Sequence, residues 1–380
     1  MGRYPQQLTT AFLFRIIFII TRSTSYHIIQ YINAFANCIS MAIIYAITKL
    51  LGKKYNVNTN YSIIIYICFL VLPFLSTFFY GDIISLTLSL ASIYFIMKYA
   101  QNKESKLWIS AAFLMSLSCM FRMNNLIWLI AMVIYLILDL LKNKYDSKEI
   151  LKHVLIIFAV ILIVVMPGEI LKLSLMNKYD IDKETSFPAI GFIYLGMIDG
   201  ERTSGWFDWG TAEMGWNNPK ESKEMYKSLA KEKLDYYIKN PRKFIKFYIT
   251  KITTMWTENT YESIWNNMSF NNSNEAGKET HENDEKLSRI REITFPLQKG
   301  VILSIFLCSA VILIQNRKKL ENEVILLVLI FLGGLSFHTI WEAKSRYAIP
   351  YIVALIPLIS INININREKI KNIFNKKSRM

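Results

Sequence analysis

Long apolar runs repeat along most of the chain, and they restrict its fold more than any other feature. A helix that crosses a bilayer needs about 20 mainly apolar residues, and the chain offers about nine such segments. They cover roughly residues 27–51, 61–79, 83–100, 107–121, 124–141, 154–173, 297–314, 324–339 and 348–365. Hydrophobic residues fill 53% of the 380 positions, which is more than one soluble core needs. The sequence therefore predicts an all-α polytopic membrane protein.

Basic residues between the apolar runs indicate how the chain is oriented. Lys and Arg gather in every second connector and in the C-terminal tail. By the positive-inside rule these connectors are cytoplasmic, so we expect a multi-pass protein of the cell membrane with a cytoplasmic C-terminus. The net charge of +15 is concentrated in these segments. We therefore expect the bilayer as a partner and no nucleic acid.

The same pattern divides the chain into five parts. Residues 1–26 are expected to form an external interfacial helix, because the apolar stretch 8–21 is too short to span comfortably; a strained tenth span is the alternative. The other parts are spans one to six in 27–173, an extracytoplasmic, mainly helical loop domain in 174–296, spans seven to nine in 297–365, and a basic cytoplasmic tail in 366–380.

Charged clusters end or interrupt three of the apolar runs on the predicted outer side. Asp82 follows Tyr80 and Gly81 at the start of a span, and Arg122 stands before Asn124 between two runs. The third cluster comprises Glu342, Lys344, Arg346 and the adjacent Tyr347. Charges at membrane depth cost several kcal/mol unless they are paired or wet, which makes them the default place to look for function. Helix capping by Asp82, snorkelling by Arg122 and self-pairing of the third cluster are the simpler alternatives.

The predicted loop domain contains two further features. Its first part mixes glycines and aromatics with acids, including Asp199, Trp206 and Asp208, which suits sugar binding and equally suits an interfacial aromatic belt. The helix expected over 241–252 has an apolar and a basic stripe. It fits a membrane surface, and a solvated face explains it as well.

The chemistry of the outer side favours an amphiphilic substrate. The sequence has no phosphate-binding glycine loop and no zinc-protease motif, and its four histidines and four cysteines are scattered, so we expect no metal site built from His or Cys. The sequence leaves the use of a divalent ion open. Basic groups beside an apolar bundle suit a lipid-linked phosphate such as a polyprenyl-phosphate sugar. A nearby carboxylate could act as the general base for an acceptor hydroxyl.

Four short motifs give the chain a resemblance to a known superfamily. They are Tyr4-Pro5-Gln6-Gln7, Gly81-Asp82-Ile83-Ile84, Phe121-Arg122-Met123-Asn124-Asn125, and the stretch from Trp341 through Tyr347 to Pro350. Together they resemble the GT-C integral-membrane glycosyltransferases, in particular bacterial relatives of protein mannosyltransferases and aminoarabinose transferases. The resemblance implies Asp82 as a catalytic acid and Arg122, Lys344 and Arg346 as contacts of the donor phosphate. Possible substrate-binding residues are Tyr80, Asn124, Glu342, Tyr347, Asp199, Trp206 and Asp208.

One departure from this superfamily changes the expectation. Its main catalytic acid lies in the first external loop, whereas residues 1–30 contain no Asp or Glu. We therefore expect a chain that lacks the first span and its acid, and whose activity as written is doubtful. The expected function is transfer of a sugar from a polyprenyl-phosphate donor to a cell-envelope acceptor. The alternatives are a transporter or flippase of lipid-linked sugars, a polymerase of such sugars, or a non-catalytic membrane subunit.

Overall fold

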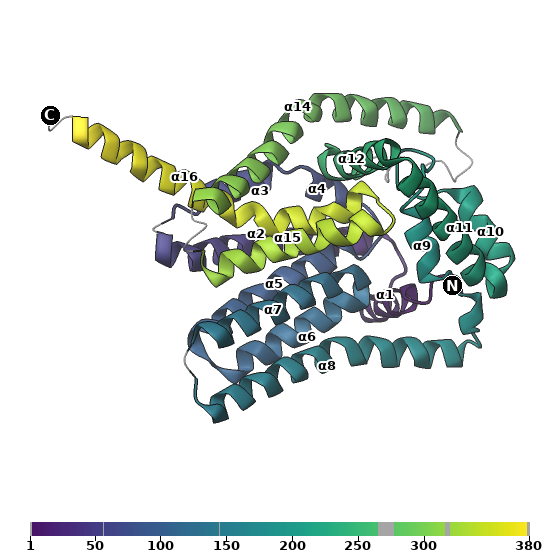
Figure 1. Cartoon of the computed structure of the whole chain (residues 1–380), viewed down its shortest axis with the longest axis horizontal. Coiled ribbons are helices and arrows are strands. Elements are labelled where there is room, and N and C mark those ends of the chain that lie inside the picture. Colours follow the sequence, from purple (N-terminus) through teal and green to yellow (C-terminus); the bar gives the residue numbers. More distant parts are fainter. Residues whose placement is uncertain (1, 56, 144, 265–276, 316–319, 378–380) are drawn as a thin grey trace. The chain divides into compact units, whose positions relative to one another are not determined.

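The computed structural model of the protein describes residues 2–55, 57–143, 145–264, 277–315 and 320–377 (Figure 1). Every regular element in these ranges is a helix, and one isolated β-bridge joins Asp199 to Ser204. This confirms the all-α prediction. The chain forms two compact units, which we call the loop unit (Met1–Ser23, Met166–Glu262, Leu332–Ile349) and the bundle unit (Thr24–Val165, Ser263–Phe331, Pro350–Met380).

The bundle unit holds most of the apolar helices. They are α2 (His27–Tyr55), α3 (Asn60–Cys68), α4 (Val71–Ser76), α5 (Asp82–Asn102), α6 (Ser105–Phe121), η1 (Met123–Asn125), α7 (Leu126–Lys142), the first part of α8 (Ser147–Lys178), α14 (Gly277–Gln315), the first half of α15 (Asn322–Ile340) and most of α16 (Ile349–Lys377). Small hydroxyl residues join neighbouring helices. Ser89 and Ser118 share a hydrogen bond of 2.7 Å between α5 and α6, as do Ser62 and Ser360 between α3 and α16. Such contacts are typical of helix packing in lipid.

Seven helices in the described residues are long and apolar enough to cross a membrane. They correspond to seven of the predicted spans, whereas α6 has 17 residues and α1 (Gln7–Thr21) has 15, so both fall among the shorter apolar helices. The predicted span over 61–79 is not one helix but is divided into α3 and α4. Pro73 has no N–H and cannot donate to the carbonyl of Phe69. The neighbouring carbonyl of Cys68 accepts a hydrogen bond from the side chain of Gln298 at 2.8 Å.

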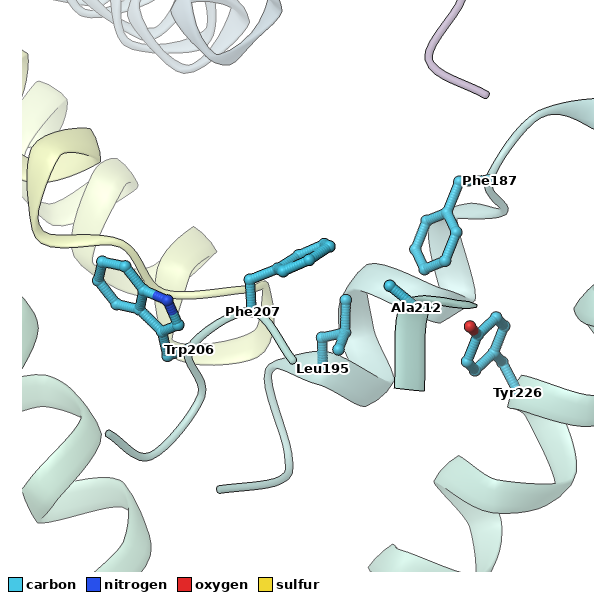
Figure 2. Packing of buried hydrophobic residues seen from close by; sticks show 6 residues of the cluster. All are labelled: Phe187, Leu195, Trp206, Phe207, Ala212 and Tyr226. Carbon is cyan, nitrogen blue, oxygen red and sulfur yellow. The ribbon is translucent and has the colours of Figure 1, made fainter. Parts of the chain in front are cut away.

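The loop unit contains shorter helices around an aromatic core. They are α1, η2 (Lys183–Thr185), α9 (Ala189–Leu195), α10 (Trp209–Asn217), α11 (Pro219–Lys239), α12 (Pro241–Thr257), η3 (Ser345–Ala348) and the ends of α8 and α15. Figure 2 shows the core residues Phe187, Leu195, Trp206, Phe207, Ala212 and Tyr226. A proline opens both α11 and α12, where its missing N–H costs no helical hydrogen bond.

A buried lysine joins three segments of the loop unit. The side chain of Lys251 on α12 donates hydrogen bonds to the carbonyls of Gly196 at 2.6 Å, Thr339 at 2.9 Å and Trp341 at 2.8 Å. The last carbonyls of a helix lack intrahelical partners, so this ammonium completes the end of α15. Burial lowers the pKa of Lys251 to about 7, and the Glu342 carboxylate opposes the shift.

The stability of the loop unit should therefore depend on pH through Lys251. Its pKa of about 7 in the folded chain lies below its ordinary value of 10.5, so between these values the unfolded chain binds more protons. Stability should then rise with pH across that window, by at most about 1.4 kcal/mol per pH unit. The measurement is thermal unfolding in detergent at several pH values, comparing the wild type with Lys251→Met. A difference between the two proteins that stays constant across the window would contradict the assignment.

Gly205 supports Lys251 from the turn before Trp206. Its φ is +77°, and a Cβ there would lie 2.6 Å from Cε of Lys251. Gly205→Ala should thus cost about 2–4 kcal/mol of stability, from the left-handed backbone and from displacement of the lysine. The control is Gly210→Ala in α10, where the nearest atom to a Cβ is 3.7 Å away. Equal unfolding temperatures for the two variants would refute this role of Gly205.

Candidate functional site

The first cluster is an ion pair in the bundle unit. Asp82 occupies the first turn of α5, and Arg122 lies in extended backbone between α6 and η1. Nε of Arg122 is 2.9 Å from Oδ1 of Asp82, and the two side chains are 15% and 11% exposed. Gly81 permits this approach, because a Cβ there would lie 3.0 Å from Cδ1 of Phe121. The close packing of the start of α5 on the end of α6 thus brings together two residues that the sequence marked separately.

The surroundings of the Asp82–Arg122 pair leave one oxygen for a ligand. The Arg122 guanidinium also lies 4.8 Å from the centre of the Tyr80 ring. Oδ2 of Asp82 is buried and accepts no hydrogen bond from the described residues. Gly81 is the N-cap residue of α5, so Asp82 is placed one position inside the helix. A buried carboxylate oxygen of this kind can accept a hydrogen bond from a substrate hydroxyl.

The second cluster lies in the loop unit and is centred on Lys344. Its ammonium is 3.2 Å from Oε1 of Glu342, whose side chain is 3% exposed. It also lies 4.8 Å from the ring centre of Phe207 and 5.8 Å from that of Trp206. In Figure 2 these two rings lie beside a pale yellow ribbon from a late part of the chain, and the Ala343 N–H donates to the Gly205 carbonyl at 2.8 Å. Self-pairing within the cluster, the simpler alternative, is therefore present in part.

The charge of Lys344 is well supported. Burial lowers the pKa of its ammonium, but the neighbouring Tyr347 and Glu342 outweigh burial and raise the pKa above its usual value. Lys344 thus stays a cation at neutral pH in a largely apolar setting. A cation that is poorly screened by water is well suited to hold an anionic phosphate.

Tyr4 brings the N-terminal segment to the same cluster. Its ring packs 6.2 Å from Phe187, 6.1 Å from Phe192 and 6.5 Å from Trp216. Burial raises the pKa of Tyr4 to about 12, with Glu342 adding to the shift and Lys344 opposing it. Glu342 and Lys344 are therefore close enough to act on the Tyr4 hydroxyl. We call Tyr4, Glu342, Lys344 and Tyr347 with the rings of Trp206 and Phe207 the Lys344 cluster.

Two acidic residues that sequence reasoning missed contact Ser345 and Arg346. The Ser345 hydroxyl lies 2.9 Å from Oε1 of Glu262 and 3.3 Å from Oε2 of Glu258. Glu262 also accepts from the backbone N–H of Arg346 at 3.4 Å. Its φ of 59° is left-handed, and burial raises its pKa while Arg346 opposes the shift. Two acids four residues apart, directly after an amphipathic helix, are the signal that could have pointed to them.

The remaining predicted residues have structural partners of their own. Asp199 accepts from the Ser204 hydroxyl at 2.6 Å and closes the turn around the β-bridge. Asp208 caps α10 by accepting from the Thr211 N–H at 2.7 Å. The backbone carbonyl of Asn124 lies 3.5 Å from the Tyr351 hydroxyl. A substrate role for these side chains stays a prediction.

The described residues contain no group of three or more His, Cys, Asp or Glu that could hold a metal ion. Both clusters contain carboxylates, cations and tyrosine side chains.

Comparison with known proteins gives one match. Residues 5–193 match the model described as the DIE2/ALG10 family, a range just under half the length of the chain. The range contains Asp82 and Arg122, whereas the segment with Lys344 lies beyond it. No curated protein and no solved structure matches the chain.

Proposed function

We propose that this protein, whose residues 5–193 match the DIE2/ALG10 family, is a membrane glycosyltransferase that uses a lipid-linked sugar. The family match is the observation that carries the proposal, since ALG10 is a membrane glycosyltransferase of the GT-C-like class. Seven candidate spans in the described residues suit a lipid-linked substrate. In its specific form, the proposal is transfer from a polyprenyl-phosphate sugar to a cell-envelope acceptor at the outer face.

The Lys344 cluster supplies the donor end of the proposed reaction. Negative charge develops on the phosphate as the anomeric carbon–oxygen bond breaks. The Lys344 ammonium, fixed by Glu342 and by the rings of Phe207 and Trp206, would stabilise that charge, with Arg346 as a second cation. A preorganised, largely buried cation loses little energy to rearrangement during the step.

Asp82 is the proposed proton acceptor for the attacking hydroxyl. The ion pair with Arg122 engages Oδ1 and orients the carboxylate, which leaves Oδ2 for the acceptor. As the acceptor oxygen bonds to the anomeric carbon, its proton passes to Oδ2 and the polyprenyl phosphate leaves with the bonding electrons. The Asp82 carboxyl then releases the proton to water and returns to its starting negative charge.

A comparison of donor classes tests this proposal. The purified protein is incubated with a bacterial envelope extract and radiolabelled sugar supplied either as polyprenyl phosphate or as nucleotide diphosphate. We expect labelled product from the polyprenyl-phosphate donor and none from the nucleotide donor, because the proposed cation site serves a phosphate at the membrane. Product from the nucleotide donor alone would contradict the proposal, and so would the absence of product from both.

A further inference from the structure

Helix α12 exposes an apolar stripe although it is not one of the candidate spans. Ile245, Ile249 and Ile252 are spaced four and three residues apart, so they lie on one face of the helix. Their exposed fractions are 55%, 61% and 36%. The face that contains Phe247, Lys251 and Met255 is buried in the loop unit. The three exposed isoleucines lie on a different face from Phe247 and Lys251, and they indicate a surface that something apolar covers up to the buried Trp256.

Basic side chains border this stripe. Arg242, Lys243 and Lys246 are all exposed in the first two turns of α12. On a helical projection, Arg242 and Lys246 follow the isoleucine face directly, on the side away from the buried face. An apolar stripe bordered by cations is complementary to a phospholipid surface, with acyl chains below and phosphates at the edge.

The contacts of Lys251 hold the middle of α12 against the end of α15 within the loop unit. Lys251 lies on the buried face and donates to the carbonyls of Thr339 and Trp341, where the candidate span α15 ends. A span of this kind ends at the interface between hydrocarbon and head groups. The middle of α12 is therefore held at the level of that interface, with its isoleucine face turned away from the protein.

We propose that α12 is a membrane-docking helix whose occupant is the phospholipid bilayer itself. Ile245, Ile249 and Ile252 lie among the upper parts of the acyl chains, and Arg242 and Lys246 contact lipid phosphates. The docking keeps the loop unit close to the bilayer, which is where a lipid-linked substrate would be found. This surface is separate from the Lys344 cluster, and it does not depend on the proposed reaction.

A fluorescent label at Ile249 tests the docking in the full chain. The four cysteines are replaced by serine, Ile249→Cys is labelled with an environment-sensitive fluorophore, and the protein is placed in mixed phosphatidylcholine and phosphatidylglycerol vesicles. We expect blue-shifted emission and at least about twofold quenching by lipids with a spin label high on the acyl chain. The matched control is Ser228→Cys, an exposed position on the polar face of α11, which should show neither effect.

A second pair of variants gives the same test without removing the native cysteines, in case the cysteine-free chain misfolds. Ile249→Trp and Ser228→Trp retain the native cysteines and are compared with the wild type in brominated lipids. Added quenching at position 249 alone supports the docking. Water-like emission at position 249 would overturn it. Blue-shifted emission without lipid quenching would also overturn it, because protein and not lipid would then cover the stripe.

Discussion

Lys344→Gln is expected to lower the rate of sugar transfer by about 10²- to 10³-fold, the usual loss when one preorganised donor to a developing oxyanion is removed. Glutamine keeps the approximate length of the side chain but cannot neutralise the departing phosphate. The neighbouring Glu342 would also lose its partner at 3.2 Å and would then repel the phosphate. Initial rates with a labelled polyprenyl-phosphate donor, measured beside the unfolding temperature, separate lost catalysis from lost folding.

Two variants serve as controls for Lys344. Lys344→Arg keeps the charge and should retain much of the activity, although its planar head group does not reproduce the ammonium. Lys227→Gln removes an exposed lysine of the loop unit that pairs with Glu224 at 3.5 Å, and it should leave transfer unchanged. Full activity of Lys344→Gln, or an equal loss in Lys227→Gln, would show that Lys344 has no special part in the reaction.

Asp82→Asn is expected to reduce transfer by about 10²- to 10⁴-fold, the usual contribution of a positioned general base. Arg122→Ala is also expected to reduce transfer, because the Asp82 carboxylate loses the cation that orients it. Each change also leaves the opposite charge poorly solvated, since the two side chains are only 11% and 15% exposed. Removing one member of such a pair should cost about 3 kcal/mol of stability. Transfer rates and thermal unfolding are measured on the same preparations.

The double variant Asp82→Asn with Arg122→Gln distinguishes a catalytic pair from a structural one. It removes both charges, so most of the lost stability should return. Transfer should stay low, because no carboxylate remains to accept the proton. If the double variant recovers transfer together with stability, the ion pair only supports the fold and the assignment of Asp82 fails.

The sequence predicted the membrane helices well because length and hydropathy alone determine whether a segment can cross a bilayer. It failed at residues 61–79, where the run is mainly apolar and the break lies near Pro73 and near Gln298, a residue far away in the chain. Hydropathy cannot register a hydrogen bond made by a distant helix. The boundaries of α5 and α7 followed the expected residues because charged or polar positions mark their ends.

For the candidate site, the sequence identified charged residues but not their partners. Asp82 and Arg122 stood out because each interrupts an apolar run, and the structure adds the salt bridge between them. The burial of Lys251 was not predicted, because a lysine in an amphipathic helix is normally assigned to the solvated face. Its buried position depends on the carbonyls of Gly196, Thr339 and Trp341, which are distant in sequence. Glu262 was missed because its contacts with Ser345 and Arg346 likewise exist only in the folded chain.

The most direct test of the proposed activity is the stoichiometry of transfer in proteoliposomes. The donor is a polyprenyl-phosphate sugar labelled in both the sugar and the lipid, and the purified protein is supplied with envelope acceptor. We predict that free polyprenyl phosphate and glycosylated acceptor form in equal amounts, and that Lys344→Gln suppresses both. Movement of intact donor across the bilayer without cleavage would contradict a glycosyltransferase and would identify a transporter of lipid-linked sugars.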